Sequence, residues 1–203
     1  MRKGLIFATL ILFCGCGGVV LDIVQVNAPA INCIFDNDCT ITVSDKSDDL
    51  VLDGMSGSGF LQSRTWPVGE SGTVGQGLYA YLYRIDLRQL VGLVDIACAV
   101  SFSIDFGPVS ALDYNGDNVA EHVFVITSGG LGNVAPTSVT QLANKVTFEF
   151  APGVCAGSAP GNGDSSFFFG LASTFAPLDV QAEVKDNNGK TYTLESTAPN
   201  FSP

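Results

Sequence analysis

The sequence has little positive charge and few side chains that commonly carry acid–base chemistry. Its 203 residues hold 9 Lys and Arg against 20 Asp and Glu, for a net charge of −11, and only one His. Binding to nucleic acid by phosphate neutralisation needs clustered Lys and Arg, so this composition excludes it. Any Ser-His-Asp or Cys-His mechanism would have to use His122. We therefore expect a non-catalytic protein.

Helical patterns and long linkers are also scarce. A hydrophobic content of 46% excludes a disordered chain, and the length suits one well-buried domain. From Cys39 onward, short alternating apolar and β-branched runs are broken by Gly, Pro, Asn and Asp, which is typical of strands and turns. Only residues 87–96 resemble a helix, and weakly. About nine or ten strands predict an all-β fold, an antiparallel β-sandwich of jelly-roll or immunoglobulin-like type.

The N-terminus predicts export. Arg2 and Lys3 precede an apolar run over residues 5–13, which is the order of charged and apolar regions in an export signal. The small residues of Ala28-Pro29-Ala30 suit a signal peptidase, and cleavage there would leave a mature domain of residues 31–203.

A second cleavage site stays open. The sequence Phe13-Cys14-Gly15-Cys16 resembles a bacterial lipobox, which implies a lipoprotein signal over residues 1–15 and a lipid on Cys16. In that case the membrane contact would be an N-terminal lipid anchor. Both alternatives place the domain outside the cytoplasm, in an extracellular, periplasmic or cell-surface location.

The cysteine count agrees with export. Beyond the signal, four cysteines remain, an even number that suits disulfides in an oxidising compartment. Four cysteines allow three connectivities, and we favour Cys33–Cys39 together with Cys98–Cys155. A zinc site is disfavoured because the chain has no CxxC pair and its single His is remote in sequence.

One stretch carries metal-binding chemistry. Residues 113–121 read Asp-Tyr-Asn-Gly-Asp-Asn-Val-Ala-Glu and place oxygen-bearing side chains at alternate positions around a Gly. Calcium prefers six to eight oxygen ligands, and alternate residues of a tight loop can point inward around it. The alternative is an acidic turn in which Asp and Asn serve only as turn residues.

The spacing resembles the acidic calcium loops of the EF-hand, dockerin, thrombospondin type 3 and FG-GAP families. The resemblance covers nine residues and implies five ligands: Asp113, Asn115, Asp117, the carbonyl of Val119, and Glu121. It departs from the EF-hand because Asn118 stands where that loop has Gly, and because no helices are expected around it. A loop that runs straight into a strand is more similar to FG-GAP. The implied role of calcium is structural.

Aromatic residues offer a weaker ligand-binding hypothesis. Tyr79, Tyr81 and Tyr83 share one face of an expected strand, because side chains alternate with period two. An exposed stripe of this kind, with Trp66 nearby, could stack against sugars, as in a carbohydrate-binding module. Because Ile85 and Leu87 continue the stripe, the alternative is that it faces the core.

The chain as a whole resembles uncharacterised secreted bacterial β-sandwich proteins, on the basis of its signal, tyrosine-alternating strand, paired cysteines and Asp/Asn/Gly loops. The resemblance implies a structural or binding domain of the cell surface or envelope, whose partner could be a glycan or another envelope component. A carbohydrate-binding module is the first alternative and a secreted hydrolase the second.

Overall fold

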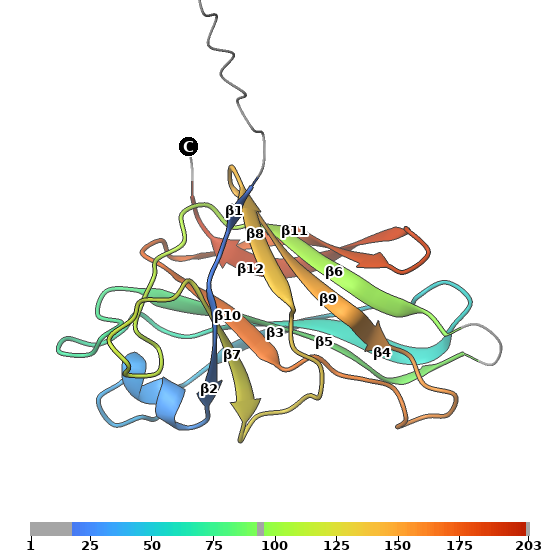
Figure 1. Ribbon diagram of the computed structural model, residues 1–203, viewed down its shortest axis with the longest axis horizontal. Helices are drawn as coiled ribbons and strands as arrows, with labels where there is room; N and C mark the ends of the chain where they lie inside the picture. Colours follow the sequence, from blue (N-terminus) through green and yellow to red (C-terminus); the bar gives the residue numbers. More distant parts are fainter. Residues whose placement is uncertain (1–17, 93–95, 202–203) are drawn as a thin grey trace, which may run out of the picture.

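The protein is a β-sandwich of two six-stranded sheets in the computed structural model (Figure 1), which describes residues 18–92 and 96–201. The predicted all-β fold is confirmed. The described residues form twelve strands rather than nine or ten. Part of the excess comes from residues 19–27, which form two strands and which only the second of the two predicted cleavage sites would leave in the mature chain.

The first sheet has the order β1-β8-β9-β6-β11-β12, and every neighbouring pair in it is antiparallel. Its strands are β1 (Val19–Val20), β8 (Ser138–Leu142), β9 (Lys145–Cys155), β6 (Cys98–Asp105), β11 (Pro177–Asp186) and β12 (Thr191–Pro199). β11 and β12 form a hairpin, because they pair directly across a turn at residues 187–190.

The second sheet has the order β2-β7-β10-β5-β4-β3, in which β2 and β7 are parallel and all other neighbours antiparallel. Its strands are β2 (Ile23–Asn27), β7 (Val123–Ser128), β10 (Phe168–Ser173), β5 (Tyr79–Val91), β4 (Ser56–Thr65) and β3 (Ser44–Asp49). The weak helix predicted for residues 87–96 is wrong at its start, because Leu87 to Val91 complete β5.

The first two strands connect the two sheets. β1 pairs with β8 in the first sheet, and two residues later β2 pairs with β7 in the second. Leu21, between the two strands, is buried in the core, and Val26 of β2 is buried on the opposite face of the second sheet. Residues 19–27 are therefore an integral part of the fold.

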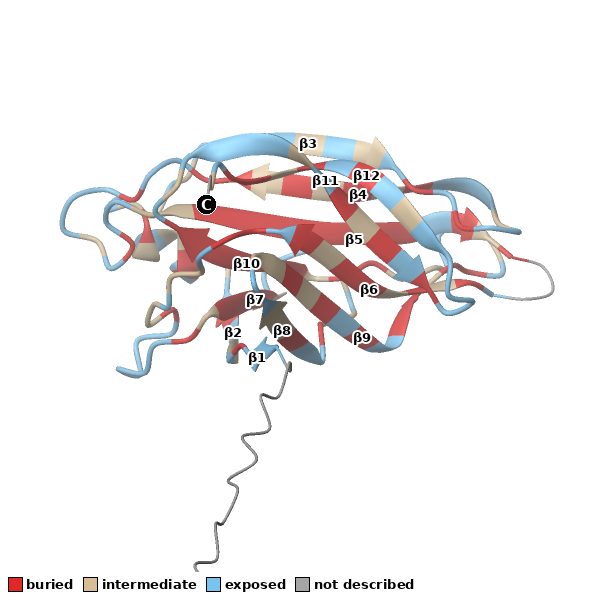
Figure 2. Cartoon of the chain, turned by 90° about the horizontal axis from the view of Figure 1, so that it is seen from above, coloured by how far each residue is buried: buried red, intermediate tan, exposed pale blue. Residues whose placement is uncertain are grey.

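The main core fills the space between the sheets. Figure 2 shows continuous burial along β5 and β10, the central strands of the second sheet. Tyr83 of β5, Phe169 of β10, and Phe102 and Phe148 of the first sheet form a connected aromatic group, with ring centroids 4.6–6.1 Å apart. Every residue of β10 is buried, so this strand is covered on both faces.

A smaller apolar cluster, the outer cluster, covers the other face of the second sheet. It contains Phe35, Trp66, Tyr114 and Phe124. Two mostly irregular segments lie over it, residues 28–43 and 112–121, and we call them the roof. Their one regular element is a short 3-10 helix, η1 (Ala30–Ile34).

Both predicted disulfides are present. Cys98 and Cys155 face each other across β6 and β9 in the first sheet. Cys33 and Cys39 close a short loop in the roof. No helix among the described residues is long and apolar enough to cross a membrane.

Candidate functional site

The Asp113–Glu121 loop is closed at its base by backbone hydrogen bonds. The N–H of Leu112 donates to the carbonyl of Glu121, and the N–H of Glu121 donates back to the carbonyl of Leu112, both at 2.9 Å. β7 begins two residues after this bridge. The loop therefore runs directly into a central part of the second sheet, in agreement with the loop-to-strand arrangement that the sequence predicts.

Side-chain oxygens inside the loop hold its backbone in place. The carboxylate of Asp113 accepts hydrogen bonds from the N–H groups of Gly116, Asp117 and Asn118, at 2.7–3.1 Å. The carboxylate of Asp117 accepts one from the N–H of Val119 at 2.8 Å. Because three donors converge on Asp113, they fix the position of its carboxylate and organise the loop around it.

Two residues of the loop have left-handed backbone conformations. Gly116 has φ of +82° and Asn118 has φ of +69°. Gly adopts such angles without steric cost and Asn tolerates them better than most residues. Asn118 therefore replaces the Gly of the EF-hand loop without preventing the tight turn. The side chain of Asn115 also bonds Asp117, through its Nδ2 and the Asp117 Oδ2, at 2.9 Å.

Glu121 is the member of the set whose charge is least satisfied. Glu121 is only 7% exposed, and its Oε2 has no hydrogen-bond partner among the residues that the structure describes. Burial, followed by the negative charges of Asp117 and Asp113, raises the pKa of Glu121 above its usual value. A buried carboxylate oxygen without a partner is costly, and a cation would offset that cost.

The predicted calcium ligands fit a hard cation in their chemistry. Among the residues described, no three His, Cys, Asp or Glu side chains converge closely enough to hold a metal ion by themselves. Calcium, however, also takes amide and main-chain oxygens. Asn115 and the carbonyl of Val119 supply these types, beside the carboxylates of Asp113, Asp117 and Glu121.

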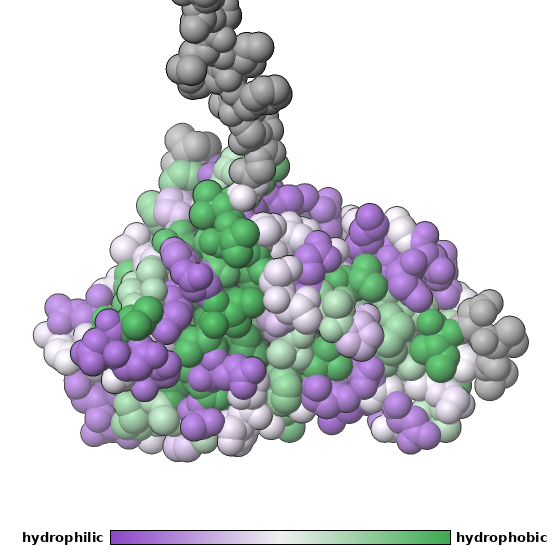
Figure 3. Space-filling model, viewed as in Figure 1, coloured by the Kyte–Doolittle hydropathy of each residue, from purple (hydrophilic) through white to green (hydrophobic). Residues whose placement is uncertain are grey.

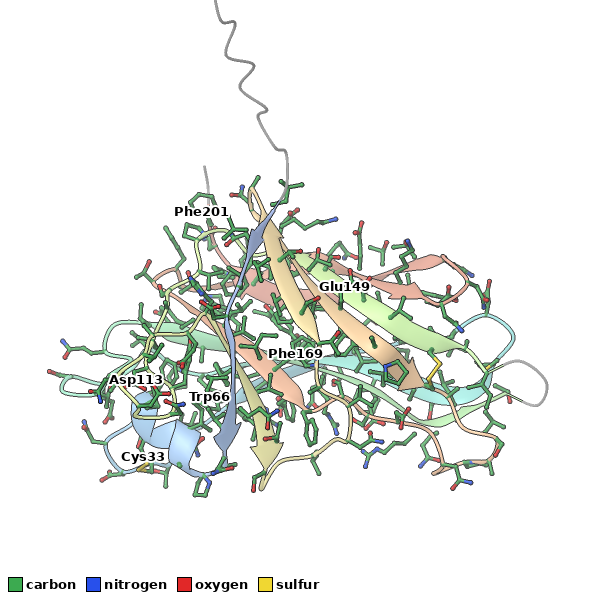
Figure 4. All side chains as sticks on the ribbon, viewed as in Figure 1. Cys33, Trp66, Asp113, Glu149, Phe169 and Phe201 are labelled. Carbon is green, nitrogen blue, oxygen red and sulfur yellow. A yellow bond between two sulfur atoms is a disulfide. The ribbon has the colours of Figure 1, made fainter. Side chains whose placement is uncertain are left out.

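The underside of the loop is apolar and attached to the outer cluster. Tyr114 is buried, its ring lies 4.8 Å from that of Phe124, and burial raises the pKa of its phenol. Phe124 in turn lies 6.1 Å from Trp66. Figure 4 shows Asp113, Trp66 and Cys33 at the same end of the molecule. Ordering of the loop is thus coupled by direct packing to the outer cluster.

The aromatic stripe faces the core, so the hypothesis of an exposed platform fails for three of its four residues. Tyr81 and Tyr83 are fully buried, and their hydroxyls donate to the carbonyls of Phe175 and Thr197. Trp66 is 4% exposed and packs in the outer cluster. Only Tyr79, at the start of β5, is half-buried, because the strand emerges there at the end of the sandwich.

Tyr79 and Trp66 contribute to a groove that the sequence did not reveal. The groove has a volume of about 710 Å³ and is lined by residues from the start of β3, the ends of β4 and β12, and the starts of β5 and β11. Its lining includes Lys46 and Asp179, which are 133 positions apart. No local motif could have indicated this site, because it forms only when both sheets are assembled.

The remaining predicted residues have separate positions. Cys16 and the lipoprotein signal predicted for residues 1–15 lie outside the described part of the chain. His122 is partly exposed, and its Nδ1 lies 3.7 Å from the carboxylate of Asp22. It is not part of the groove lining.

Comparison with family models, with curated proteins and with solved structures gives no significant match to this chain. Its functional interpretation therefore rests on the geometry described above.

Proposed function

We propose that this protein is a non-catalytic, exported structural or binding domain of the cell envelope, and that its Asp113–Glu121 loop binds calcium. The observation that carries the proposal is the buried Oε2 of Glu121, which has no hydrogen-bond partner within residues 18–92 and 96–201. Burial, and then the negative charges of Asp117 and Asp113, raise the pKa of this carboxylate. Repulsion of this kind is offset when a divalent cation binds.

The ligands of the ion would be the side chains of Asp113, Asn115, Asp117 and Glu121 with the carbonyl of Val119. When bound, calcium supplies positive charge and joins the loop to the start of β7. The residues of the loop position the ring of Tyr114 on that of Phe124, and this contact keeps the second segment of the roof against the outer cluster. The role is structural, and extracellular modules of this type bind calcium at ambient millimolar levels.

Thermal unfolding tests the calcium site. The exported protein, with both disulfides formed, is unfolded in excess calcium and again in EDTA. Calcium at about a hundredfold above its dissociation constant should add about 2.7 kcal/mol to the free energy of unfolding. The double variant Asp113→Ala, Asp117→Ala should lose this increment.

A matched control removes the same charge elsewhere. Asp38 and Asp49 are exposed, so Asp38→Ala, Asp49→Ala should keep the full response to calcium. The proposal fails if calcium produces no upward shift in the parent protein, or if the loop variant and the control respond equally.

The arrangement of His122 supports a non-catalytic role. Its nearest charged partner is the exposed carboxylate of Asp22, on the short segment between β1 and β2, and it lies outside the groove lining. A hydrolase would need this only imidazole beside a nucleophile in a pocket, or a close carboxylate pair. Absence of turnover with ester and glycoside substrates is the expected result.

The position of β1 and β2 supports export as a lipid-anchored protein. The two disulfides suit an oxidising compartment. Cleavage after Ala30 would remove β1, β2 and the buried side chains of Leu21 and Val26, whereas cleavage before Cys16 would preserve them. We therefore favour a mature protein that begins at Cys16 and carries lipid there.

The exposed side chains near this end agree with an anchor close to a membrane. Val19 and Val20 are each 67% exposed, and Leu142 of the neighbouring β8 is 61% exposed. Figure 3 shows hydrophobic surface along β1 and β2.

Mass spectrometry of the mature protein decides between the two cleavage sites. A chain beginning at lipid-modified Cys16 is expected, and Cys16→Ala should abolish lipid labelling. A mature chain that begins at Ile31 would contradict the anchor and require the sandwich to form without β1 and β2.

A further inference from the structure

The groove is a concavity at the end of the sandwich where the roof, β3 and the β11–β12 hairpin meet. Its volume of about 710 Å³ falls within the range of about 300–1,000 Å³ that is usual for small-ligand sites. Val43 and Trp66 of the outer cluster line one side, and Leu178 and Thr197 of the first sheet line the other. Both sheets and the roof must therefore be in place for the groove to exist.

The apolar part of the lining presents an aromatic ring beside flat apolar groups. Tyr79 is half-buried at the groove, Pro67 follows Trp66 on the chain, and Leu178 is 49% exposed. The ring of Tyr79 also packs against the main core, which supports it from one side. Rings of this kind provide a surface for the C–H face of a sugar.

The charged side chains of the groove are already paired with one another. Asp45 receives two hydrogen bonds from Arg64, at 2.7 and 2.9 Å. Lys46 lies 3.1 Å from Asp179 and 3.0 Å from Glu195. An ionic ligand would find no unpaired countercharge among these groups, and the net charge of −11 repels polyanions. The electrostatics therefore favour a neutral ligand.

Hydroxyl groups complete the lining. Thr42, Ser44, Thr65 and Thr197 all border the groove, and each hydroxyl both donates and accepts hydrogen bonds. The paired carboxylates of Asp45 and Asp179 keep further acceptor positions. A ligand rich in hydroxyl groups matches this mixture better than an apolar molecule would.

We propose that this groove binds a neutral oligosaccharide, with Tyr79 stacking on a sugar ring and the surrounding hydroxyls and carboxylates bonding its hydroxyl groups. The inference rests on the proposed function as a non-catalytic envelope domain and names its ligand class. It does not involve the calcium loop directly, since none of the five proposed calcium ligands lines the groove.

Titration with defined oligosaccharides tests the proposal. The probes are the hexasaccharides of β-1,4-glucose, α-1,4-glucose and β-1,4-N-acetylglucosamine, with calorimetry and tryptophan fluorescence as readouts in the presence of calcium. Trp66 is the only tryptophan and lines the groove, so its emission reports on this site. At least one probe should bind, and Tyr79→Ala should weaken its binding tenfold or more.

Three further variants separate stacking from folding. Tyr79→Phe keeps the ring and should retain binding within about threefold, since the stacking surface is unchanged. Leu178→Glu changes an exposed side chain, so it should fold normally and still weaken binding by introducing an unpaired charge into the groove. Leu142→Ala removes another exposed Leu, on β8, which lies three strands from β11 in the first sheet, and should have no effect.

Two results would overturn the proposal: none of the probes binds at millimolar concentration, or the binding of a probe is unchanged in both Tyr79→Ala and Leu178→Glu. Either result, obtained with a protein that still responds to calcium, would reject the groove as an oligosaccharide site and would not contradict the proposed function. Loss of the calcium response with oligosaccharide binding retained would reject the calcium site alone.

Discussion

The two apolar clusters of this protein are built in different ways. The main core lies between two sheets, and its aromatic side chains come from strands whose backbone groups are paired in regular ladders. The outer cluster has a sheet on one side only, and its other side is the mostly irregular roof. An irregular segment over an apolar surface must satisfy its backbone polar groups by individual contacts.

The roof makes these contacts one by one. The Cys33–Cys39 disulfide closes its first segment. Hydrogen bonds join this segment to the connection between β4 and β5. Asn37 donates two hydrogen bonds to the carboxylate of Glu70, and the N–H of Gly75 donates one to the carbonyl of Ile34. Its second segment depends on the carboxylates of the Asp113–Glu121 loop. Stability in the main core is thus distributed, while stability in the roof depends on a few cross-links.

The largest expected loss of stability comes from the main core. Phe169→Ala removes a ring that lies 4.6 Å from Phe148 and 5.7 Å from Phe102. A buried Phe to Ala change costs about 3–5 kcal/mol, through lost transfer energy and the remaining cavity. Urea unfolding, monitored by circular dichroism, measures the loss in the free energy of unfolding. A loss below about 1 kcal/mol would show that the core collapses around the gap.

The contribution of each disulfide to stability should increase with the length of chain that it encloses. Cys98–Cys155 joins positions 57 apart and Cys33–Cys39 positions 6 apart. Loop-closure entropy gives about 4 kcal/mol for the first and about 2 kcal/mol for the second. Double Cys→Ala variants in urea test this order. The reverse order would mean that the roof loop stabilises the native state by more than chain entropy.

The roof should open without the sheets. Tyr114→Ala removes the ring that packs on Phe124. The amides of residues 116–119 should then exchange about tenfold faster, which corresponds to a decrease of about 1.4 kcal/mol in the free energy of local opening. Amides of β10 should keep their exchange rates. Equal acceleration in both places would show that the two clusters unfold as one unit.

The smallest expected effect concerns Glu121. Because its folded pKa is raised, its contribution to stability in EDTA is present below the unfolded pKa of about 4.3 and is lost as pH rises through the folded value. Glu121→Gln should remove this dependence and raise the melting temperature in EDTA at pH 7 by no more than about 2–4 °C. It should also reduce the response to calcium.

The exposed Glu149 supplies the control for this experiment. Glu149→Gln removes one carboxylate from the solvent-facing side of β9 and should leave both the pH dependence and the calcium response unchanged. If Glu121→Gln lowers the melting temperature in EDTA instead, its carboxylate is satisfied in the metal-free protein and the basis of the calcium proposal is wrong.

Sequence reasoning succeeded where a pattern is local. The alternation of Tyr81 and Tyr83 indicated a strand, and its continuation into Ile85 and Leu87 indicated the core, as the structure confirms. The Cys33–Cys39 pairing, between positions six apart, was also predicted correctly. Because only four cysteines were considered, that pairing left Cys98–Cys155 as the second one despite its separation of 57 positions.

It was less successful where the partner is distant. β1 and β2 were overlooked because an apolar N-terminal stretch has the same composition in a signal and in a buried strand. The groove was not foreseen because its walls come from opposite ends of the sequence.

The path of the first two strands has a mechanical consequence. β1 and β2 follow one another along one side of the sandwich, and they are bonded to β8 in one sheet and to β7 in the other (Figure 1). A pull applied at residue 18 along this direction loads both sets of hydrogen bonds in shear, so several must break together. A domain held by its N-terminus would then resist drag and stretching at the point where force enters the chain.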